Sequence, residues 1–331
     1  MTRRPAAALA TTTDTAPEPA VLRVREPGDI LGVLPYMLGF HPTESLVAAF
    51  VRDRRVVVTA RMDLAVAADL EALVDQLEMV SLRVDSRALL LVGYSADPVI
   101  RDVVRDLADV VPFALVDALA VSGDTWWSVC CEGECCPAEG RPYDIGAHPL
   151  AAEAVLAGIS AATTREDVAA LTAGPAAADR ERLLAATDDT AHRLAGLNRR
   201  RRQRRMKQIV ERVLRSGGPT ETEALEIAVL ARDLAVRDTA WALMTRQQGE
   251  AHVALWRAVV AVTVWPYEAA PLGMLAVAGW LSGNGTLLNC CIDRLQEVAP
   301  DYTLLEMCRD ISERAIPPQL FDTMVADLRR L

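Results

Sequence analysis

Two short segments carry the side chains best suited to acid–base chemistry. His41, Thr43 and Ser45 lie close together in one segment, and Arg61 and Asp63 follow in a second. These residue types predict a general base in His41, a hydroxyl partner in Ser45 or Thr43, and in Asp63 a carboxylate that orients the base or binds a metal. With Arg61 holding an anionic group, the set predicts a small-molecule hydrolase or transferase.

The same residue types also occur in connections that have no catalytic role. In that interpretation His41 caps a carbonyl group, and Thr43 or Ser45 closes a tight turn between a helix and a strand. The sequence contains neither the nucleophile elbow G-x-S-x-G, nor the dinucleotide-binding G-x-G-x-x-G, nor a phosphate-binding loop. We therefore favour the structural interpretation.

Four cysteines, Cys130, Cys131, Cys135 and Cys136, flank a turn that contains a glycine. Thiolates arranged in this way could hold a zinc ion, although the spacing differs from C-x-x-C and the nearest histidine is His148. A reversible disulfide between Cys130 and Cys135 and ordinary buried thiols are equally good interpretations. Zinc is thus one of three alternatives for the cluster.

A strongly basic run lies in the second half of the chain. Its arginines are Arg199, Arg200, Arg201, Arg202, Arg204 and Arg205. Such a run could neutralise several phosphates, which would make the protein a nucleic-acid-associated factor with salt-dependent binding. No aromatic residue is interleaved to stack on bases. We therefore favour the alternative of a solvated helix whose arginines pair with acidic neighbours.

The elements that must position these residues alternate between strand and helix in the first half. The predicted strands cover 46–51, 56–62, 88–94 and 113–121, with 125–131 returning antiparallel, and the predicted helices cover 29–38, 65–82 and 99–111. Successive strand–helix–strand steps favour parallel pairing. We expect an α/β amino-terminal domain with a mixed, partly parallel sheet of about five strands and flanking helices.

This topology brings the chemically interesting residues to one edge of the sheet. A hairpin closed at 52–55 places Ser45 and Glu44 opposite Met62 and Asp63. The strand predicted over 88–94 ends at the same edge. Open α/β sheets bind ligands at such an edge, beyond the carboxyl ends of their parallel strands. The residues expected to contact a ligand there are Thr43, Arg61, Gly93 and Tyr94. The cysteine cluster is expected at a tip away from this edge.

From about residue 149 helical patterns replace strand patterns, and glycine and proline separate successive helices. The pattern predicts an all-α, loosely tetratricopeptide-like domain of stacked helix pairs without a regular repeat. Cys290, Cys291 and Cys308 at helical positions are expected to be small core residues. The predicted organisation is a flexible tail over 1–20, an α/β domain with a cysteine-rich hairpin over 21–148, and a helical domain over 149–331.

Composition limits the class of protein. The formal net charge of −10 argues against a surface that coats nucleic acid, and 51% hydrophobic with 24% charged residues is typical of a globular chain. The apolar stretches are too short or too interrupted for a transmembrane helix. The opening residues lack the apolar core of a signal peptide, so we expect a cytoplasmic protein with reduced thiols.

Several segments resemble an actinobacterial family classified as a domain of unknown function. They are the segments L-G-F-H-P with S-L-V from Leu38, R-M-D-L from Arg61, C-C-P-x-E-G from Cys135 and W-L-x-G-x-G from Trp280, together with Asp293 and Pro300-Asp301-Tyr302. The resemblance covers nearly the whole chain, and it implies no activity. We therefore expect a non-enzymatic interaction or ligand-sensing module whose helical domain binds a protein partner, with the enzyme and the nucleic-acid factor as alternatives.

Overall fold

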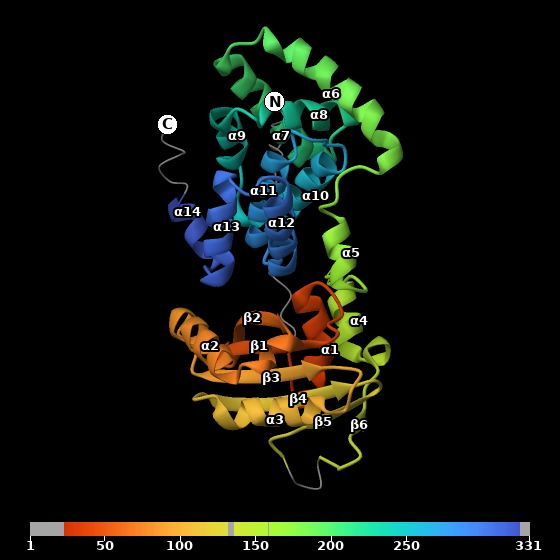
Figure 1. Cartoon of the computed structure of the whole chain (residues 1–331), viewed down its shortest axis with the longest axis vertical. Coiled ribbons are helices and arrows are strands. Elements are labelled where there is room, and N and C mark those ends of the chain that lie inside the picture. The colour runs from red at the N-terminus through yellow and green to blue at the C-terminus, as the bar shows by residue number, and fades with distance from the viewer. Residues whose placement is uncertain (1–22, 132–135, 158, 325–331) are drawn as a thin grey trace, which may run out of the picture.

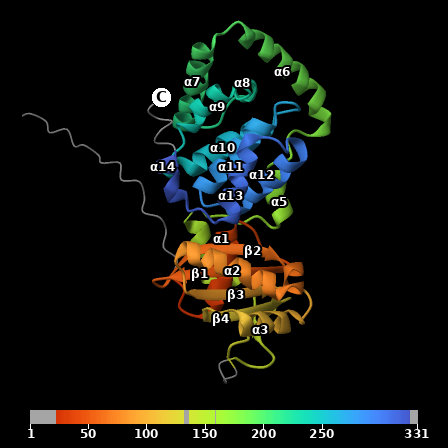
Figure 2. The ribbon, with the colours of Figure 1, turned by 60° about the vertical axis from the view of Figure 1, so that its left-hand side comes forward.

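The computed structural model describes residues 23–131, 136–157 and 159–324, so the tail predicted over 1–20 lies outside the described residues. The chain forms an α/β lobe followed by a helical lobe, and the two lobes stack along the long axis of the molecule (Figures 1 and 2). The predicted change from a mixed α/β half to a helical half is therefore confirmed. The helical pattern begins with α4 (Pro149–Leu156), next to the predicted boundary.

The α/β lobe contains a six-stranded mixed sheet with the order β2-β1-β3-β4-β5-β6. The strands are β1 (Ser45–Arg52), β2 (Arg55–Asp63), β3 (Ala88–Tyr94), β4 (Ala114–Ser122), β5 (Thr125–Ser128) and β6 (Arg141–Pro142). β3 and β4 are parallel, and the other neighbours are antiparallel. The parallel pairing predicted for the strands at 56–62 and 88–94 was wrong, because the hairpin places β1 between β2 and β3. The prediction of about five strands missed β6, because the dipeptide Arg-Pro has no alternating pattern to indicate a strand.

The β1–β2 hairpin differs in register from its prediction. Asp53 and Arg54, with φ of 50° and 61°, form a two-residue turn. A β-bulge next to this turn, at Phe50/Val51, then shifts the register by one residue. Ser45 therefore lies opposite Asp63, and the prediction that it lies opposite Met62 was wrong.

Helices cover both faces of the sheet. One face packs against α2 (Leu70–Val84) and α3 (Ile100–Val110), and the other packs against α1 (Pro27–Leu38). β3 is buried on both faces, which explains its continuous apolar sequence. The helix predicted from residue 65 begins later, because the Asp69 side chain caps α2 by accepting from the Ala72 amide at 3.1 Å.

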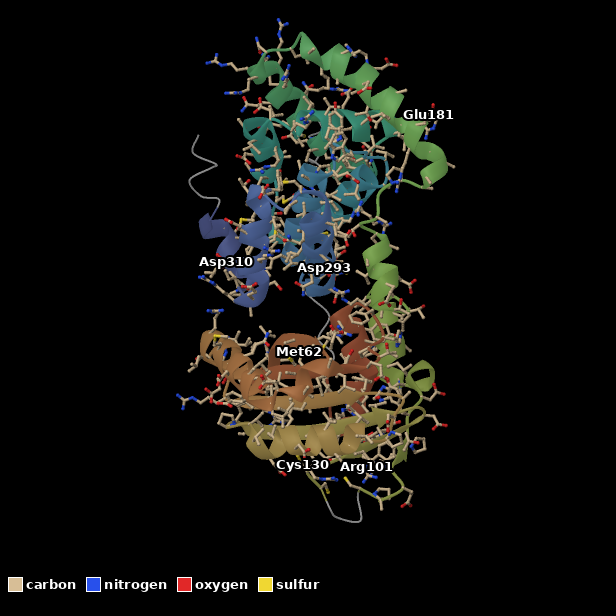
Figure 3. The ribbon with its side chains drawn as sticks, viewed as in Figure 1. Met62, Arg101, Cys130, Glu181, Asp293 and Asp310 are labelled. Atoms are coloured by element: carbon tan, nitrogen blue, oxygen red, sulfur yellow. The ribbon has the colours of Figure 1, made fainter. Side chains whose placement is uncertain are left out.

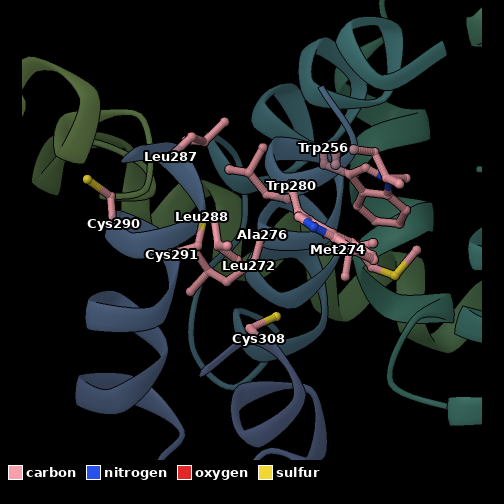
Figure 4. Close-up of a cluster of buried hydrophobic side chains, with 14 of the residues drawn as sticks. Trp256, Leu272, Met274, Ala276, Trp280, Leu287, Leu288, Cys290, Cys291 and Cys308 are labelled. Carbon is pink, nitrogen blue, oxygen red and sulfur yellow. The ribbon is translucent and has the colours of Figure 1, made fainter. Parts of the chain in front are cut away.

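The helical lobe is built around α11 (Ala269–Leu281), a helix that is buried from its second residue to its end. Its neighbours include α10 (Gly249–Val260), α12 (Gly285–Val298) and α13 (Thr303–Glu313), and they pack in chain order. Figure 4 shows Met274 and Trp280 of α11 among their buried neighbours. Cys290, Cys291 and Cys308 belong to the same core, as predicted (Figure 4).

The remaining helices complete the outer parts of the helical lobe. They are α5 (Arg165–Ala170), α6 (Arg180–Ala195), α7 (Arg199–Ser216), α8 (Glu221–Leu230), α9 (Leu234–Trp241) and α14 (Phe321–Met324). In the part of the chain that the structure describes, every helix falls short of the length and apolar character needed to cross a membrane.

Candidate functional site

The strand register brings the predicted residues together at one edge of the sheet. Ser45, at the start of β1, pairs with Asp63 at the end of β2 on one side and with Tyr94 at the end of β3 on the other. Tyr94 in turn pairs with Val121 near the end of β4. The loop that carries His41 enters β1 at this edge.

The hydroxyl group of Ser45 is buried between two partners. It donates a hydrogen bond to the Thr43 carbonyl at 2.6 Å and accepts one from Arg61 Nε at 2.8 Å. Arg61 also pairs with Asp63, with 2.6 Å between Nη1 and Oδ1. The bulge lies near the turn, so Arg61 and Asp63 remain on the same face of β2. The geometry is that of a closed turn, in which the Ser45 proton already has an acceptor.

Glu44 also makes contacts at this sheet edge, although the sequence predicted no role for it. Its backbone has a φ of 43°, and its carboxylate accepts from Ser95 Oγ at 2.9 Å and from the Ala96 amide at 2.8 Å. The Glu44 carbonyl accepts from the Leu64 amide at 3.0 Å. Its position beside Ser45 at the strand start was the only signal in the sequence, because partners 51 and 52 residues away leave no local pattern.

The contacts of His41 differ from those of Ser45. Its backbone amide donates to the Ala162 carbonyl at 3.1 Å, and its ring makes an edge contact with Tyr36 at 6.4 Å between centroids. Burial lowers the pKa of His41 below 6.5. Among the described residues, no hydrogen bond joins the His41 ring to Ser45 or Asp63. The three predicted catalytic residues are therefore neighbours in the fold without forming a linked set.

Gly93 and Tyr94 lie at the predicted edge but face the interior. A Cβ atom on Gly93 would lie 2.4 Å from Val104 Cγ2 and 2.7 Å from Ile100 Cδ1, so the glycine lets α3 pack closely on β3. Tyr94 is 4% exposed, and its buried hydroxyl has no hydrogen-bond partner in the described part of the chain. Burial raises the pKa of Tyr94 well above 10.

The same loop forms the junction between the two lobes. The Ala162 amide donates to the Gly39 carbonyl at 2.8 Å, and Thr286 Oγ1 of α12 donates to the Leu38 carbonyl at 2.7 Å. Thr286 thereby satisfies one of the carbonyl groups left open at the end of α1. Gly39 has a φ of 81° and lies beside Asn284, whose side chain caps α12. The C-terminus of α1 thus meets the N-terminus of α12, a favourable arrangement of helix dipoles.

An ion pair adjoins this junction. Arg165 Nη2 of α5 lies 2.7 Å from Asp293 Oδ2 of α12. Burial lowers the pKa of Arg165, but its hydrogen bond to Asp293 and the negative charges of Asp293 and Asp63 outweigh burial and raise it. Figure 3 shows Met62 of β2 and Asp293 on the facing sides of the two lobes. Asp63 therefore acts electrostatically on the helical lobe as well as on Arg61.

A cavity of about 470 Å³ opens next to this ion pair, between α12 and α13. Its charged lining residues are Asp293, Glu297, Glu313 and Arg309, which leaves a negative balance. Arg309 hydrogen-bonds Gln296, and Ser312 Oγ donates to Asn289 at 2.6 Å across the two helices. The lining could accommodate a positively charged side chain.

The cysteine cluster lies at the end of the α/β lobe far from the junction, where Figure 3 shows Arg101 and Cys130. Cys130 is exposed and Cys136 is half-buried, while Cys135 lies outside the described residues. Burial raises the pKa of the Cys130 thiol. Among the described residues, no cluster of three histidine, cysteine or acidic side chains could hold a metal ion. The predictions of zinc and of a disulfide at Cys130, Cys131, Cys135 and Cys136 stay predictions.

The basic run forms the start of α7, and its arginines divide into two groups. Arg199 pairs with Asp233 at 3.3 Å, Arg205 pairs with Glu226 at 2.7 Å, and Arg202 donates to a backbone carbonyl. Arg200, Arg201 and Arg204 are exposed. Pairing with acidic neighbours was the favoured interpretation, and it describes part of the run.

A family model described as Domain of unknown function (DUF4192) matches residues 27–319. No curated protein and no solved structure matches the chain. The matched region includes the sheet edge, the junction and most of the helical lobe, so both lobes belong to one family unit.

Proposed function

We propose that this chain, which belongs to the domain-of-unknown-function family DUF4192, is a non-enzymatic interaction module of the cytoplasm. Its α/β lobe senses a ligand, and its helical lobe, a loosely tetratricopeptide-like stack, binds a protein partner. The junction around Gly39 and Thr286 couples the two lobes.

One observation carries the proposal: the reactive side chains of the sheet edge hold the junction loop in place. The Ser45 hydroxyl bridges Thr43 and Arg61, and the Glu44 carboxylate is occupied by Ser95 and Ala96. A catalytic nucleophile needs a base within hydrogen-bond reach. Since the His41 ring contacts Tyr36 and, among the described residues, makes no hydrogen bond to Ser45, the edge supports a structural and coupling role better than catalysis.

The partner surface that we propose is the cavity between α12 and α13. Its negative lining adjoins the Arg165–Asp293 ion pair. A basic segment of a partner would compete with Arg165 for Asp293 and would thereby act on the junction. This arrangement supports a partner that contributes a positively charged side chain.

Turnover assays test the absence of catalysis. The intact protein is incubated with chromogenic carboxylic and phosphoric esters, beside the variants His41→Gln and Asp63→Asn. The matched control is Asp53→Asn. Asp53 lies in an exposed hairpin turn and has a left-handed backbone conformation, which asparagine also adopts readily. We expect no turnover in any sample. Turnover by the parent and the control that both site variants lose would overturn the proposal.

Quantitative affinity capture from the native cytoplasm, followed by pairwise binding of purified candidates, tests the partner surface. Glu313→Arg reverses a charge in the cavity lining, and Glu306→Arg reverses an exposed charge on the same helix outside it. We expect one partner to bind the parent and Glu306→Arg but to be lost with Glu313→Arg. An identical set of proteins with all three baits contradicts the proposed surface.

A second candidate function is weak binding of nucleic acid by α7, which the exposed Arg200, Arg201 and Arg204 favour. Their joint replacement by alanine should abolish binding of single-stranded DNA at low salt and flatten its salt dependence. The matched control is Arg199→Ala with Arg205→Ala, because these two arginines are already paired with carboxylates. Absence of binding by the parent at low salt removes this candidate.

A further inference from the structure

The two outer strands of the sheet differ in how well their free edges are protected. One outer strand is β6, which has two residues and ends in Pro142, so it offers almost no backbone to a further strand. The other is β2, whose nine residues pair with β1 on one side only. Folded proteins usually shorten, charge or cover such an edge, because its open N–H and C=O groups pair readily with another chain.

None of these protections is present along the middle of β2. Residues 56–60 read Val-Val-Val-Thr-Ala, a segment rich in β-branched side chains that contains neither a charge nor a proline. Among the described elements, only β1 and α1 make more than isolated contacts with β2. No hydrogen bond from the described helices, loops or side chains reaches the outer backbone groups of the strand. The edge is therefore long, uncharged in its middle and uncovered.

The strand register identifies the backbone groups of β2 that point outward. The Leu64 amide donates to the Glu44 carbonyl at 3.0 Å, one step beyond the last paired residues of the hairpin. Directly opposite residues of antiparallel strands alternate between those that exchange hydrogen bonds and those that do not. The even-numbered residues before Leu64 therefore bond to β1. The residues whose amide and carbonyl groups point away from β1 are Thr59, Arg61 and Asp63.

Charge and position indicate the kind of strand that fits this edge. The Asp63 side chain is 74% exposed at the end of β2, so a lysine or arginine on an added strand could form a cross-strand pair with it. Figure 3 shows Met62, the neighbour of Asp63, facing Asp293 of the acidic cavity. The helical lobe lies beyond β2, in the direction in which a further sheet would extend (Figures 1 and 2). A single strand therefore fits better than the sheet of a second copy of this chain.

We propose that β2 binds an extended, basic segment of the protein partner, which adds a strand to the sheet between the two lobes. Main-chain hydrogen bonds to Thr59, Arg61 and Asp63 give this strand its affinity, and a basic side chain opposite Asp63 gives it specificity. The inference rests on the proposed partner-binding function and names the mode of recognition. A strand held there contacts both lobes, which connects partner binding to the junction.

Fluorescent peptides as long as β2, titrated with the intact protein, test the edge. The first peptide alternates valine with threonine and ends in a pair of arginines, and the second has glutamates in place of the arginines. The third is the first with N-methyl groups on two consecutive central amides, which block both of its edges and keep its charge. We expect the first to bind and each change to weaken binding by ~10-fold or more. Hydrogen exchange of the β2 amides should slow with the first peptide, while that of β3 stays unchanged.

Thr59→Pro removes an outward N–H group that the hairpin does not use, and it should weaken the first peptide by ~10-fold or more. Thr59→Val is the matched control, because valine keeps both the amide and the β-branched shape. Circular dichroism verifies folding, and the methylated peptide decides the question if the proline variant unfolds.

Three results would overturn the inference: no binding of the arginine peptide, equal binding of its methylated form, or protection outside β2 alone. Self-association of the parent that Thr59→Pro abolishes would also overturn it, since a second copy would then occupy the edge. A captured partner that depends on Glu313 but binds Thr59→Pro like the parent contradicts this inference alone. Peptide binding at β2 without any Glu313-dependent partner contradicts the proposed function alone.

Discussion

Ser45 illustrates at the residue scale how a candidate nucleophile can serve the fold. Its side chain has no exposed surface, and its hydroxyl group links the loop before β1 to an arginine of β2. Replacement by alanine would leave the Arg61 Nε donor and the Thr43 carbonyl without this partner. Buried polar groups that lose their partner are costly, so the role of Ser45 can be measured as stability.

We expect Ser45→Ala to lower the free energy of unfolding by about 1–3 kcal/mol in urea titrations. The matched control is Ser216→Ala, because the exposed Ser216 bonds only within its own helix, at the end of α7. Its effect should stay within about 0.5 kcal/mol. Equal stability of Ser45→Ala and the parent would contradict a structural role for this hydroxyl.

A second residue, His252 of α10, makes stability depend on pH. It is 0% exposed, and burial lowers its pKa from 6.5 to about 4. The unfolded chain therefore binds a proton more readily than the folded one, so His252 favours folding above pH 6.5 and that contribution is lost as pH falls toward 4. Near pH 4, the contribution of His252 to the free energy of unfolding has fallen by about 3 kcal/mol.

Urea titrations between pH 7 and pH 4 measure this effect. We expect His252→Leu to lose less stability than the parent over that interval. The matched control is His192→Gln, because the His192 ring is exposed on α6. A parent and a His252→Leu variant with the same pH dependence would show that another group is responsible.

At the scale of elements, close packing of helices on strands determines where glycine is required. Gly93 of β3 faces Ile100 and Val104 of α3, with no room for a methyl group. Its place at the sheet edge predicted a ligand contact, but the helix occupies the space above it. The same strand ends in Tyr94, whose side chain is also buried.

Gly93→Ala should destabilise the protein by about 1–3 kcal/mol, because α3 must move away from β3. Thermal unfolding followed by circular dichroism measures the loss. Gly218→Ala is the matched control, since a Cβ there meets nothing within 4 Å. If both variants unfold at the same temperature, α3 and β3 do not pack as described.

At the scale of the whole molecule, the junction decides whether the lobes behave as one body. Short hydrogen bonds connect the C-terminus of α1 to α12, with the Arg165–Asp293 pair beside them, and one buried hydrophobic cluster extends from α1 into the helical lobe. The polar contacts fix the relative orientation of the lobes, so their removal is expected to allow movement about the shared hydrophobic cluster.

The double variant Thr286→Val with Arg165→Gln should uncouple the lobes. We expect two calorimetric transitions in place of one, and a larger radius of gyration by small-angle X-ray scattering. Thr239→Val is the control, because the Thr239 hydroxyl bonds within α9, to the Ala235 carbonyl at 3.3 Å. A double variant with the transition and radius of the parent would show that other contacts couple the lobes.

Local sequence patterns were enough to predict most helices and strands and the edge where Ser45, Asp63 and Tyr94 meet. Hydrophobic periodicity and turn residues are local properties, and strand direction follows from the order of elements. They could not predict β6, which has two residues, or the bulge at Phe50/Val51, which shifts the register of Ser45.

Only the tertiary structure decided which partners the polar side chains have. Ser45 bonds to Arg61, Thr286 to Leu38 and Arg101 stacks on Trp127, and each pair joins residues that are distant in the chain. Hydrogen bonds and ion pairs form only when two atoms approach to within a few tenths of an ångström of their preferred distance. The spacing of residues along the sequence does not encode such distances. The sequence therefore determined the elements and their common edge, while packing between elements determined the closed turn and the junction.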